Sequence, residues 1–314
     1  MGFTITEKIL ARAAGLESVK AGDEVMAKPD FVLAYDFPGY TDVYFKQMKE
    51  EFGIDKVAEP ERFGIFIDHM VPVATPKEEE LHQGTRAWCA ENGVELFERR
   101  GIGHQVAAEV GYATPGAFVV HFDGHISQLG TFGTLGIGMR RNVLEAFVRE
   151  KVSIKVPHTV RVNLHGELQK GVMARDVFHH MVRVLGPSSC RFQVLELGGP
   201  GIETLTTEGI QSITCLAMFT GAVTAIVNPD KERLEYALPR ARKKLEPVYS
   251  DPDAEYAAVH DIDLSDLEPI VVVPPTPANT RNLSEYLGLD VQTGYLGSCA
   301  SGRLEDMEIA ARIL

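Results

Sequence analysis

Short β-rich runs alternate with helical patterns along most of the chain, and this alternation constrains the fold more than any other feature. Helices are expected over roughly 7–14, 40–51, 76–91, 134–150, 173–185, 204–220, 230–244 and 303–313. Between them lie the runs FVLAY, FGIFID, VELFE, AFVVHFD, TVRVNL, FQVLEL, TAIV and PIVVVP. Strands that alternate with helices of this length predict βαβ units and largely parallel sheets. A further strand is expected over 291–296, just before the last helix.

Composition and charge narrow the class of protein. A chain of 314 residues is long enough for two domains that each bury a core. The formal charge of −13 disfavours nucleic acid and anionic membranes as partners, although local arginines can still bind a small anion. There is no apolar run of the ~18 residues that a membrane helix needs. The four cysteines include no CxxC, which favours a reducing, cytoplasmic location over a disulfide scaffold.

Two Asp–His pairs and a further histidine stand where a strand or a glycine turn opens into a loop. Asp68 and His69 follow FGIFI, His104 lies in GIGHQ, and Asp123 and His125 lie in FDGHIS. Parallel sheets carry ligand sites beyond the carboxyl ends of their strands, so these residues are candidates for the rim of one pocket. An aspartate beside a histidine orients the imidazole and raises its pKa, which suits proton transfer. Surface or hydrogen-bonded core histidines stay open as the alternative.

The cysteines and one glutamate complete the set of candidates. Cys299 lies in a Gly-Ser-Cys turn before a predicted helix, where a thiol can become a thiolate nucleophile or a metal ligand. An ordinary turn cysteine is the alternative. Cys215, in the apolar segment ITCLAMFTG, is expected to be a core residue. Nothing local pairs a base with Cys299, which disfavours a cysteine–histidine hydrolase. Glu196 is expected at a strand end in LELGG, with a solvated turn glutamate as the alternative.

Eight segments, taken in chain order, resemble the aconitase superfamily, and within it the large subunits of 3-isopropylmalate dehydratase and homoaconitase. They span nearly the whole chain: TITEKILARAAG, FGIFIDHMVP, GIGHQVAAEVGYATPGAFVV, FDGHISQLGTFGTLGIG, VRVNLHGELQKGVMARDVFHHMV, LELGGPGIETLTTEGIQSITCLAMFTGA, EPIVVVPPTPANT and GSCASGRLEDMEIAA. The resemblance implies a hydro-lyase or isomerase of amino-acid biosynthesis, such as leucine biosynthesis. Its substrate would be a small anionic 2-hydroxy di- or tricarboxylate of the 3-isopropylmalate, homocitrate or methylmalate type.

The resemblance also implies a four-iron four-sulfur cluster held by three cysteines, with one iron open to the substrate. Cys299 matches the first ligand, in the family's GSCTN turn. The CxxC that supplies the other two ligands does not occur in this chain. We therefore expect the cluster site to be incomplete in this chain alone. The expected partners are a source of the CxxC segment and a small swivelling-domain subunit.

By the same resemblance, the catalytic groups that hydrogen-bond the departing hydroxyl or the substrate are Asp68, His69, His104, Asp123, His125 and Glu196. Two motifs depart from the family pattern. Gly124 replaces the serine of the DSH motif, and Ala300 and Ser301 replace the threonine and asparagine of GSCTN. These departures leave a second hypothesis open, namely a non-catalytic, degenerate paralogue that acts as a binding or regulatory subunit.

The expected architecture is α/β and aconitase-like, with two complete three-layer α/β domains and the start of a third. The domains are expected over 1–158 and 159–265, and residues 266–314 would form the start of the third and carry Cys299. Unpaired strand edges and apolar surface in this last segment would favour association.

Overall fold

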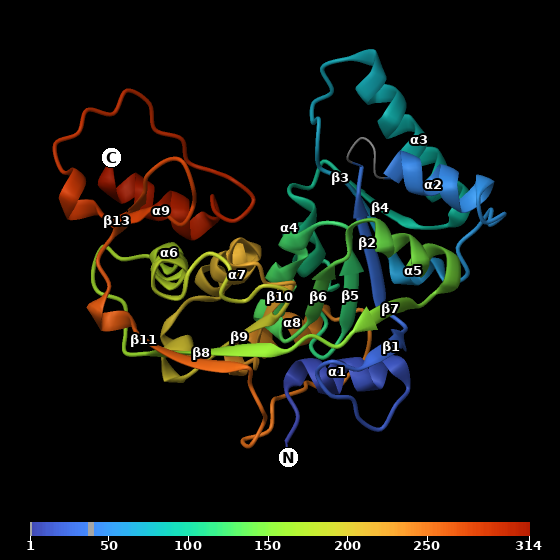
Figure 1. The fold of residues 1–314 in the computed structure, drawn as a ribbon. Helices are drawn as coiled ribbons and strands as arrows, with labels where there is room; N and C mark the ends of the chain where they lie inside the picture. Colours follow the sequence, from blue (N-terminus) through green and yellow to red (C-terminus); the bar gives the residue numbers. More distant parts are fainter. Residues whose placement is uncertain (1, 37–40) are drawn as a thin grey trace.

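The computed structural model describes residues 2–36 and 41–314 (Figure 1). Its largest sheet has five parallel strands in the order β4–β3–β2–β5–β6. The strands are β2 (Phe31–Tyr35), β3 (Phe63–Ile67), β4 (Glu95–Glu98), β5 (Phe118–His121) and β6 (Leu135–Gly138). Because both faces of the central strands are covered, β2, β3 and β5 are buried along their whole length and mainly apolar, with His121 at the end of β5 as the polar exception.

Five helices accompany this sheet: α1 (Ile5–Ala14), α2 (Thr41–Glu50), α3 (Pro76–Asn92), α4 (Gly103–Glu109) and α5 (Leu144–Arg149). Helix α3, expected over 76–91, has a clear capping signal at each end. Thr75 and Glu78 form a capping box, and Gly93 ends the helix in the left-handed conformation. Tyr40, where the sequence predicts the start of the second helix, lies outside the described residues.

A second parallel sheet has four strands in the order β10–β9–β8–β11. They are β8 (Thr159–His165), β9 (Val194–Gly198), β10 (Thr224–Val227) and β11 (Ala258–Asp263). Helices α6 (Ala174–Leu185) and α7 (Thr207–Leu216) pack against each other beside it, and α8 (Lys231–Ala237) follows β10. The α/β class with parallel sheets is therefore confirmed.

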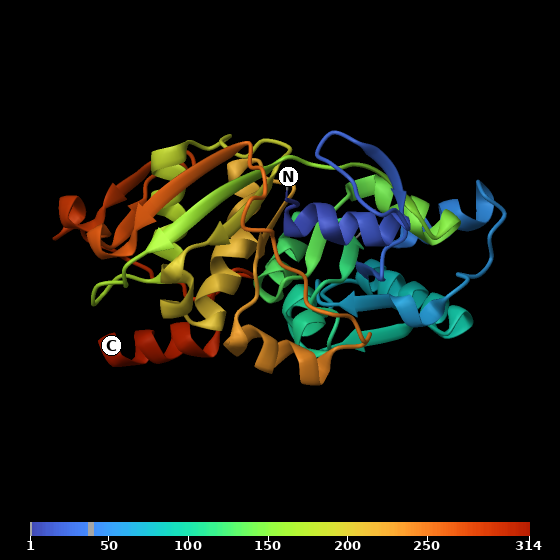
Figure 2. The ribbon, with the colours of Figure 1, turned by 90° about the horizontal axis from the view of Figure 1, so that it is seen from below.

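Two small antiparallel pairs and a last helix complete the chain. Strand β1 (Glu24–Ala27) pairs with β7 (Val152–Lys155), and β12 (Ile270–Val272) pairs with β13 (Thr280–Asn282). Helix α9 (Leu304–Ile313) ends the chain, and the segment from β12 onward lies over α6 and α7 (Figures 1 and 2). Among the described residues, no helix combines the length and apolar character needed to cross a membrane.

The apolar core has two parts. The first is formed almost entirely by residues between Ile5 and Val156, and the second by residues between Val160 and Leu267 together with Ala300. The two sheets meet where β6 lies beside β10, and Thr224 Oγ1 donates to the carbonyl of Gly136 there. The division into domains at 158 and 265 stays a prediction.

Four predicted elements differ in the structure. Residues 134–150, expected to be helical, begin as β6, because Leu135–Gly138 pairs with β5. The helix expected over 204–220 is regular only over Thr207–Leu216 and ends in a 3₁₀ turn. The helix expected over 230–244 stops at Ala237, since Pro239 lacks the N–H needed to continue it. Residues 291–296 form no strand, because no neighbouring strand pairs with them.

Candidate functional site

Three strand ends of the first sheet supply one side of the candidate site. Strand β2 ends in Tyr35, β3 leads into Asp68 and His69, and β5 leads into Asp123 and His125. Because these strands are parallel neighbours, their carboxyl ends lie at the same edge of the sheet. The predicted Asp–His pairs therefore belong to one edge.

Asp68 and His69 form the pair that the sequence suggests. Asp68 Oδ1 lies 2.7 Å from His69 Nδ1, and its other oxygen accepts the backbone N–H of Gly103 at 2.5 Å. The carboxylate thus links the end of β3 to the start of α4. This hydrogen bond raises the pKa of His69 despite partial burial, so the imidazole carries its proton to higher pH.

His104 enters the site from α4. Its Nδ1 lies 2.8 Å from the hydroxyl of the buried Tyr35, which orients the ring. Its Nε2 then faces the loop before α9, 3.1 Å from the carbonyl oxygen of Cys299 and 3.8 Å from Cys215 Sγ. His104 is 2% exposed, so it lies beneath the site rather than on its rim.

His125 lies on the 3₁₀ segment η2 (Gly124–Phe132), which packs against α4, α7 and β10 where the two sheets meet (Figure 1). Its Nδ1 donates to the carbonyl oxygen of Cys215 at 3.0 Å and lies 3.4 Å from Cys215 Sγ. A hydrogen bond with Cys299 raises the pKa of His125 to about 9, although burial opposes this. His125 is therefore an imidazolium at neutral pH.

Cys299 is the group whose chemistry the fold changes most. Hydrogen bonds from Cys215, His104 and His125 hold the pKa of Cys299 far below that of an ordinary thiol. Conversely, the hydrogen bond to Cys299, together with burial, raises the pKa of Cys215. The pair therefore holds a thiolate at Cys299 and a protonated thiol at Cys215.

Cys215 was not predicted from the sequence to belong to this group. Cys215 was expected to be a core residue, and it is buried, but its Sγ faces Cys299 and two histidines. No residue close in the sequence pairs a base with Cys299, but His104 and His125 reach it from distant parts of the chain. The packing of η2 against both α7 and α4 brings these side chains together, and no local motif signals it.

Arg303 adds positive charge beside the thiols. Its guanidinium donates to Gln128 Oε1 at 3.0 Å, to Ser212 Oγ at 3.0 Å and to the carbonyl of Ala300 at 2.9 Å. These acceptors are all uncharged, and burial lowers the pKa of Arg303. An arginine held by neutral partners beside a site is suited to bind a substrate carboxylate.

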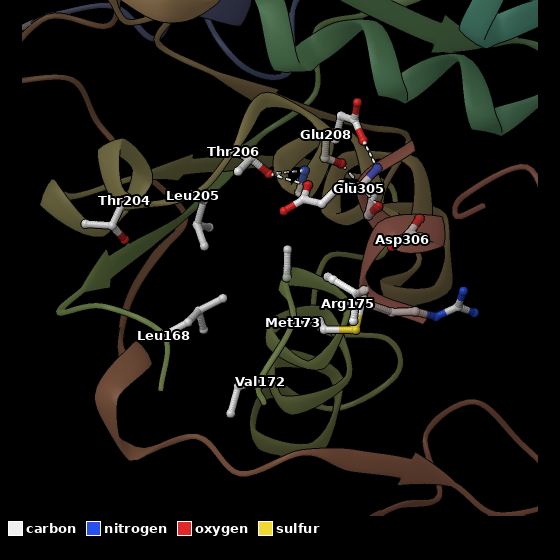
Figure 3. Close-up of a pocket in the computed structure, with 14 residues that line it drawn as sticks. Leu168, Val172, Met173, Arg175, Thr204, Leu205, Thr206, Glu208, Glu305 and Asp306 are labelled. Carbon is white, nitrogen blue, oxygen red and sulfur yellow. Dashed lines mark hydrogen bonds between the residues drawn. The ribbon is translucent and has the colours of Figure 1, made fainter. Parts of the chain in front are cut away.

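A cavity of about 140 Å³ lies next to this region, between α6, α7 and α9 (Figure 3). Glu305 joins the elements around it, because its side chain accepts from Thr206 Oγ1 at 2.7 Å and its N–H donates to Glu208 at 3.1 Å. Arg175 lines the cavity and binds the hydroxyl of Ser301. The cavity contains none of the predicted site residues, and its walls fix α9 and the Cys299 loop in place.

Glu196 lies apart from the other candidates. It is the central residue of β9 rather than a strand-end residue, and it is fully buried. Its carboxylate binds Arg161 at 2.5 Å and accepts from Ser250 and Tyr256. Burial raises the pKa of Glu196, and Arg161 opposes that shift. These contacts join β9 to the 250–256 segment, and the predicted catalytic role of Glu196 stays a prediction.

The cysteines and histidines that lie together in the structure show whether this chain could hold the iron–sulfur cluster that the resemblance implies. Such a cluster is held mainly by thiolates, each on its own iron. The described residues bring two thiols together, those of Cys215 and Cys299, while Cys89 lies in α3 and Cys190 bonds Ser189 instead. Two adjacent thiols and an imidazole do not fit a four-iron cluster.

Comparison with known proteins supports the family that the ordered motifs resemble. The Aconitase family (aconitate hydratase) matches residues 7–288. The 3-isopropylmalate dehydratase large subunit 1 of Methanopyrus kandleri is 36% identical over 317 residues, which cover 100% of this chain and 75% of that protein. The 3-isopropylmalate dehydratase large subunit of Aquifex aeolicus is 33% identical over 316 residues, which cover 100% of this chain and 72% of that protein.

A probable methanogen homoaconitase large subunit of Methanothermobacter thermautotrophicus is 33% identical over 316 residues, with 99% of this chain and 74% of that protein covered. Among solved structures, Thermococcus kodakaraensis aconitase X in its holo form aligns over 76% of this chain and 57% of that chain, with a TM-score of 0.45 and 11% identity. The chain belongs to the Aconitase family, a family of hydro-lyases.

Proposed function

We propose that the chain is the large subunit of a hydro-lyase that dehydrates and rehydrates a 2-hydroxy di- or tricarboxylate of the 3-isopropylmalate, homocitrate or methylmalate type. The observation that carries this proposal is the meeting of the Asp68–His69 pair, two further histidines and the Cys299 loop at one sheet edge. Family membership supports the reaction class, and the names of the relatives support the substrate class.

Each residue at this edge has a proposed part in the elimination of water. His69 donates a proton to the departing hydroxyl, because Asp68 keeps its imidazole protonated and its side chain is 39% exposed. Asp123 and the His125 imidazolium form the wall beside it. Arg303 binds a carboxylate of the substrate. The proton on the adjacent carbon is removed by a base from a partner, in keeping with the resemblance.

The proposal includes a small subunit and a source of further thiolates. The relatives are named as large subunits, which supports a two-subunit enzyme. The four-iron cluster of the family and the CxxC segment stay expectations from the resemblance. The four cysteines are free thiols, which supports a reducing, cytoplasmic location.

A turnover experiment tests the function. The full chain is purified without oxygen, combined with a candidate small subunit, and assayed for the unsaturated acid formed from a panel of 2-hydroxy acids. His69→Gln is expected to lower kcat by about 100-fold or more, as for loss of a general acid. His165→Gln is the matched control, because His165 forms a comparable pair with Asp261, at 2.8 Å, on the second sheet. Equal loss in both variants would contradict the assigned role.

The proposed role of His69 also predicts a pH dependence. Activity should fall as pH rises through the raised pKa of His69, and that descending limb should disappear in His69→Gln. Folded protein without turnover of any tested hydroxy acid, with or without the small subunit, would instead favour the non-catalytic paralogue.

One observation favours the alternative function of a cysteine–histidine hydrolase, because the Cys299 thiolate lies beside the His125 imidazolium. Family membership argues against it. Selective alkylation of Cys299 distinguishes the two functions, because it would abolish hydrolysis of an ester substrate if the chain were such a hydrolase. No hydrolysis before or after alkylation is the expected result.

A further inference from the structure

Two thiols and an imidazole converge where α4, α7 and the loop before α9 meet. His104 Nε2, Cys215 Sγ and Cys299 Sγ all lie within 4.8 Å of one another. Nε2 of His104 is 3.8 Å from Cys215 Sγ. A tetrahedral ion with bonds of ~2.3 Å to sulfur and ~2.0 Å to nitrogen holds its donors roughly 3.5–3.8 Å apart. Small side-chain movements therefore bring all three atoms onto one ion.

The distances between the three donor atoms distinguish a site for a single ion from a site for a cluster. Donors on one ion are neighbours, whereas a four-iron cluster distributes its thiolates over separate irons. Cys215 and Cys299 are close enough to hydrogen-bond each other. The donor types also narrow the choice, since thiolate and imidazole favour Zn²⁺ or Fe²⁺ over Mg²⁺ or Ca²⁺.

Burial and hydrogen bonds already hold the three donors in position. Cys215 and His104 are almost completely buried, so solvent does not compete for them. The Tyr35 hydroxyl, 2.8 Å from His104 Nδ1, orients the ring so that Nε2 faces the thiols. The Nδ1 of His125 is engaged by the Cys215 carbonyl at 3.0 Å, which positions His125 as a hydrogen-bond partner rather than a ligand.

The geometry points to a mononuclear metal site in which His104, Cys215 and Cys299 bind one Zn²⁺ or Fe²⁺ ion and leave a fourth position open. Three protein ligands with an open position are the pattern of catalytic rather than structural zinc sites. An ion there would bind a hydroxyl or carboxylate oxygen as a Lewis acid. The ion site stands on the donor geometry alone, and only its catalytic use rests on the proposed function.

Cobalt titration of the full chain tests the site directly. The reduced chain is stripped of metal without oxygen and titrated with Co²⁺, followed by the absorption of tetrahedral cobalt and of sulfur-to-cobalt charge transfer. One Co²⁺ per chain is expected, with charge-transfer intensity for two thiolates, and Zn²⁺ should displace it. Iron and acid-labile sulfide are measured after anaerobic reconstitution of the same preparation.

Variants assign the ligands. Cys215→Ser and Cys299→Ser should each remove about half of the charge-transfer intensity, and each, like His104→Gln, should weaken Co²⁺ binding more than about 100-fold, beyond the effect of losing an outer hydrogen bond. Cys190→Ser is the matched control, because Cys190 is a buried thiol that bonds Ser189 and does not belong to the group of three donors. Cys299 is only partly buried, so Cys299→Ser stays informative if Cys215→Ser fails to fold.

The outcomes separate the two proposals. Absence of tetrahedral Co²⁺, equal binding by the Cys299→Ser variant, or four irons with four sulfides per chain would each overturn the mononuclear site. One ion bound without hydro-lyase turnover supports the site and counts against the proposed function. Hydro-lyase turnover by a chain that binds no ion would support the proposed function and contradict the metal site.

Discussion

At the scale of single residues, Cys299 shows how completely neighbours can change the chemistry of a side chain. Its turn lies before a helix, yet the three groups that stabilise its thiolate come from α4, η2 and α7. The sequence turn marks Cys299 as a candidate, while its ionisation is a property of tertiary contacts. Hydrogen bonds to the charged form explain the direction of the pKa change.

This ionisation predicts the reactivity of Cys299 in the metal-free, reduced chain. Its rate of alkylation by iodoacetamide should be nearly constant between about pH 8 and pH 6, whereas an ordinary thiol slows about tenfold per pH unit. Cys215→Ala removes the first hydrogen-bond donor and should restore part of the pH dependence. Peptide mass spectrometry over a pH series measures the rate. A tenfold fall per pH unit in the unaltered chain would contradict the assignment.

A buried histidine makes a second prediction at this scale. Burial in α6 lowers the pKa of His179 to about 4. Since the folded pKa lies below the unfolded value of 6.5, the stability contribution is present above pH 6.5 and is lost as pH falls toward 4. His179→Leu should therefore lower the number of protons taken up on unfolding by about one in this window. Urea unfolding at several pH values measures this.

The control for this experiment is His165→Leu, because His165 is half exposed. It should leave the acid limb of the stability profile nearly unchanged. If both variants keep the full acid limb, groups other than His179 account for the loss of stability at low pH.

At the scale of elements, local rules placed most helices and strands correctly. The capping box at Thr75 and the left-handed Gly93 are local signals, and α3 follows them. Residues 134–138 show where such rules fail, since the stretch becomes β6 through pairing with β5. Hydrogen bonding to a neighbouring strand outweighed the helical pattern there.

The packing of η2 on β10 yields a prediction about an element. A methyl group on Gly130 would lie 1.8 Å from the carbonyl oxygen of Ala225, which is backbone and cannot move aside cheaply. Gly130→Ala should therefore destabilise the fold by about 3 kcal/mol or more. Because η2 carries His125, the variant should also lose reactivity of the Cys299 site. Denaturant unfolding measures the first effect and alkylation the second.

Gly84→Ala is the matched control for Gly130→Ala. Gly84 lies within α3, and a methyl group there would meet nothing within 4 Å. This variant should stabilise the fold by about 0.5–1 kcal/mol, through the higher helix propensity of alanine. Equal destabilisation by both variants would show that steric overlap with Ala225 is not the cause.

At the scale of the whole molecule, each of the two sheets has its own apolar core. Of the described residues after β13, Ala300 belongs to the core of the second sheet, and none belongs to the core of the first. The apolar side chains after β13 are instead largely exposed, as Leu287, Leu289, Val291 and Tyr295 are each at least 69% exposed. Few backbone hydrogen bonds hold this stretch, so its local opening costs little free energy.

Limited proteolysis should therefore cut first within residues 287–296. Brief chymotrypsin treatment followed by mass spectrometry should give a large fragment that retains both sheets. Phe192 provides an internal comparison, because it is 73% exposed but its N–H bonds the carbonyl of Gly221 at 3.0 Å. A first cut at Phe192, or within the strands of either sheet, would contradict this view of the molecule.

The sequence by itself determined the α/β class, the parallel sheets, the helix caps and the strand-end positions of Asp68, His69, Asp123 and His125. These follow from apolar periodicity, capping residues and the geometry of parallel strands, all of which act over short stretches of chain. Ordered motifs also identified the family. Tertiary structure alone decided that Cys215 faces Cys299, that His104 and His125 reach both, and that Glu196 lies in a separate buried network. Such pairings join residues that lie far apart in the chain, for example 35 positions in Arg161–Glu196 and 195 positions in His104–Cys299, so no local pattern encodes them.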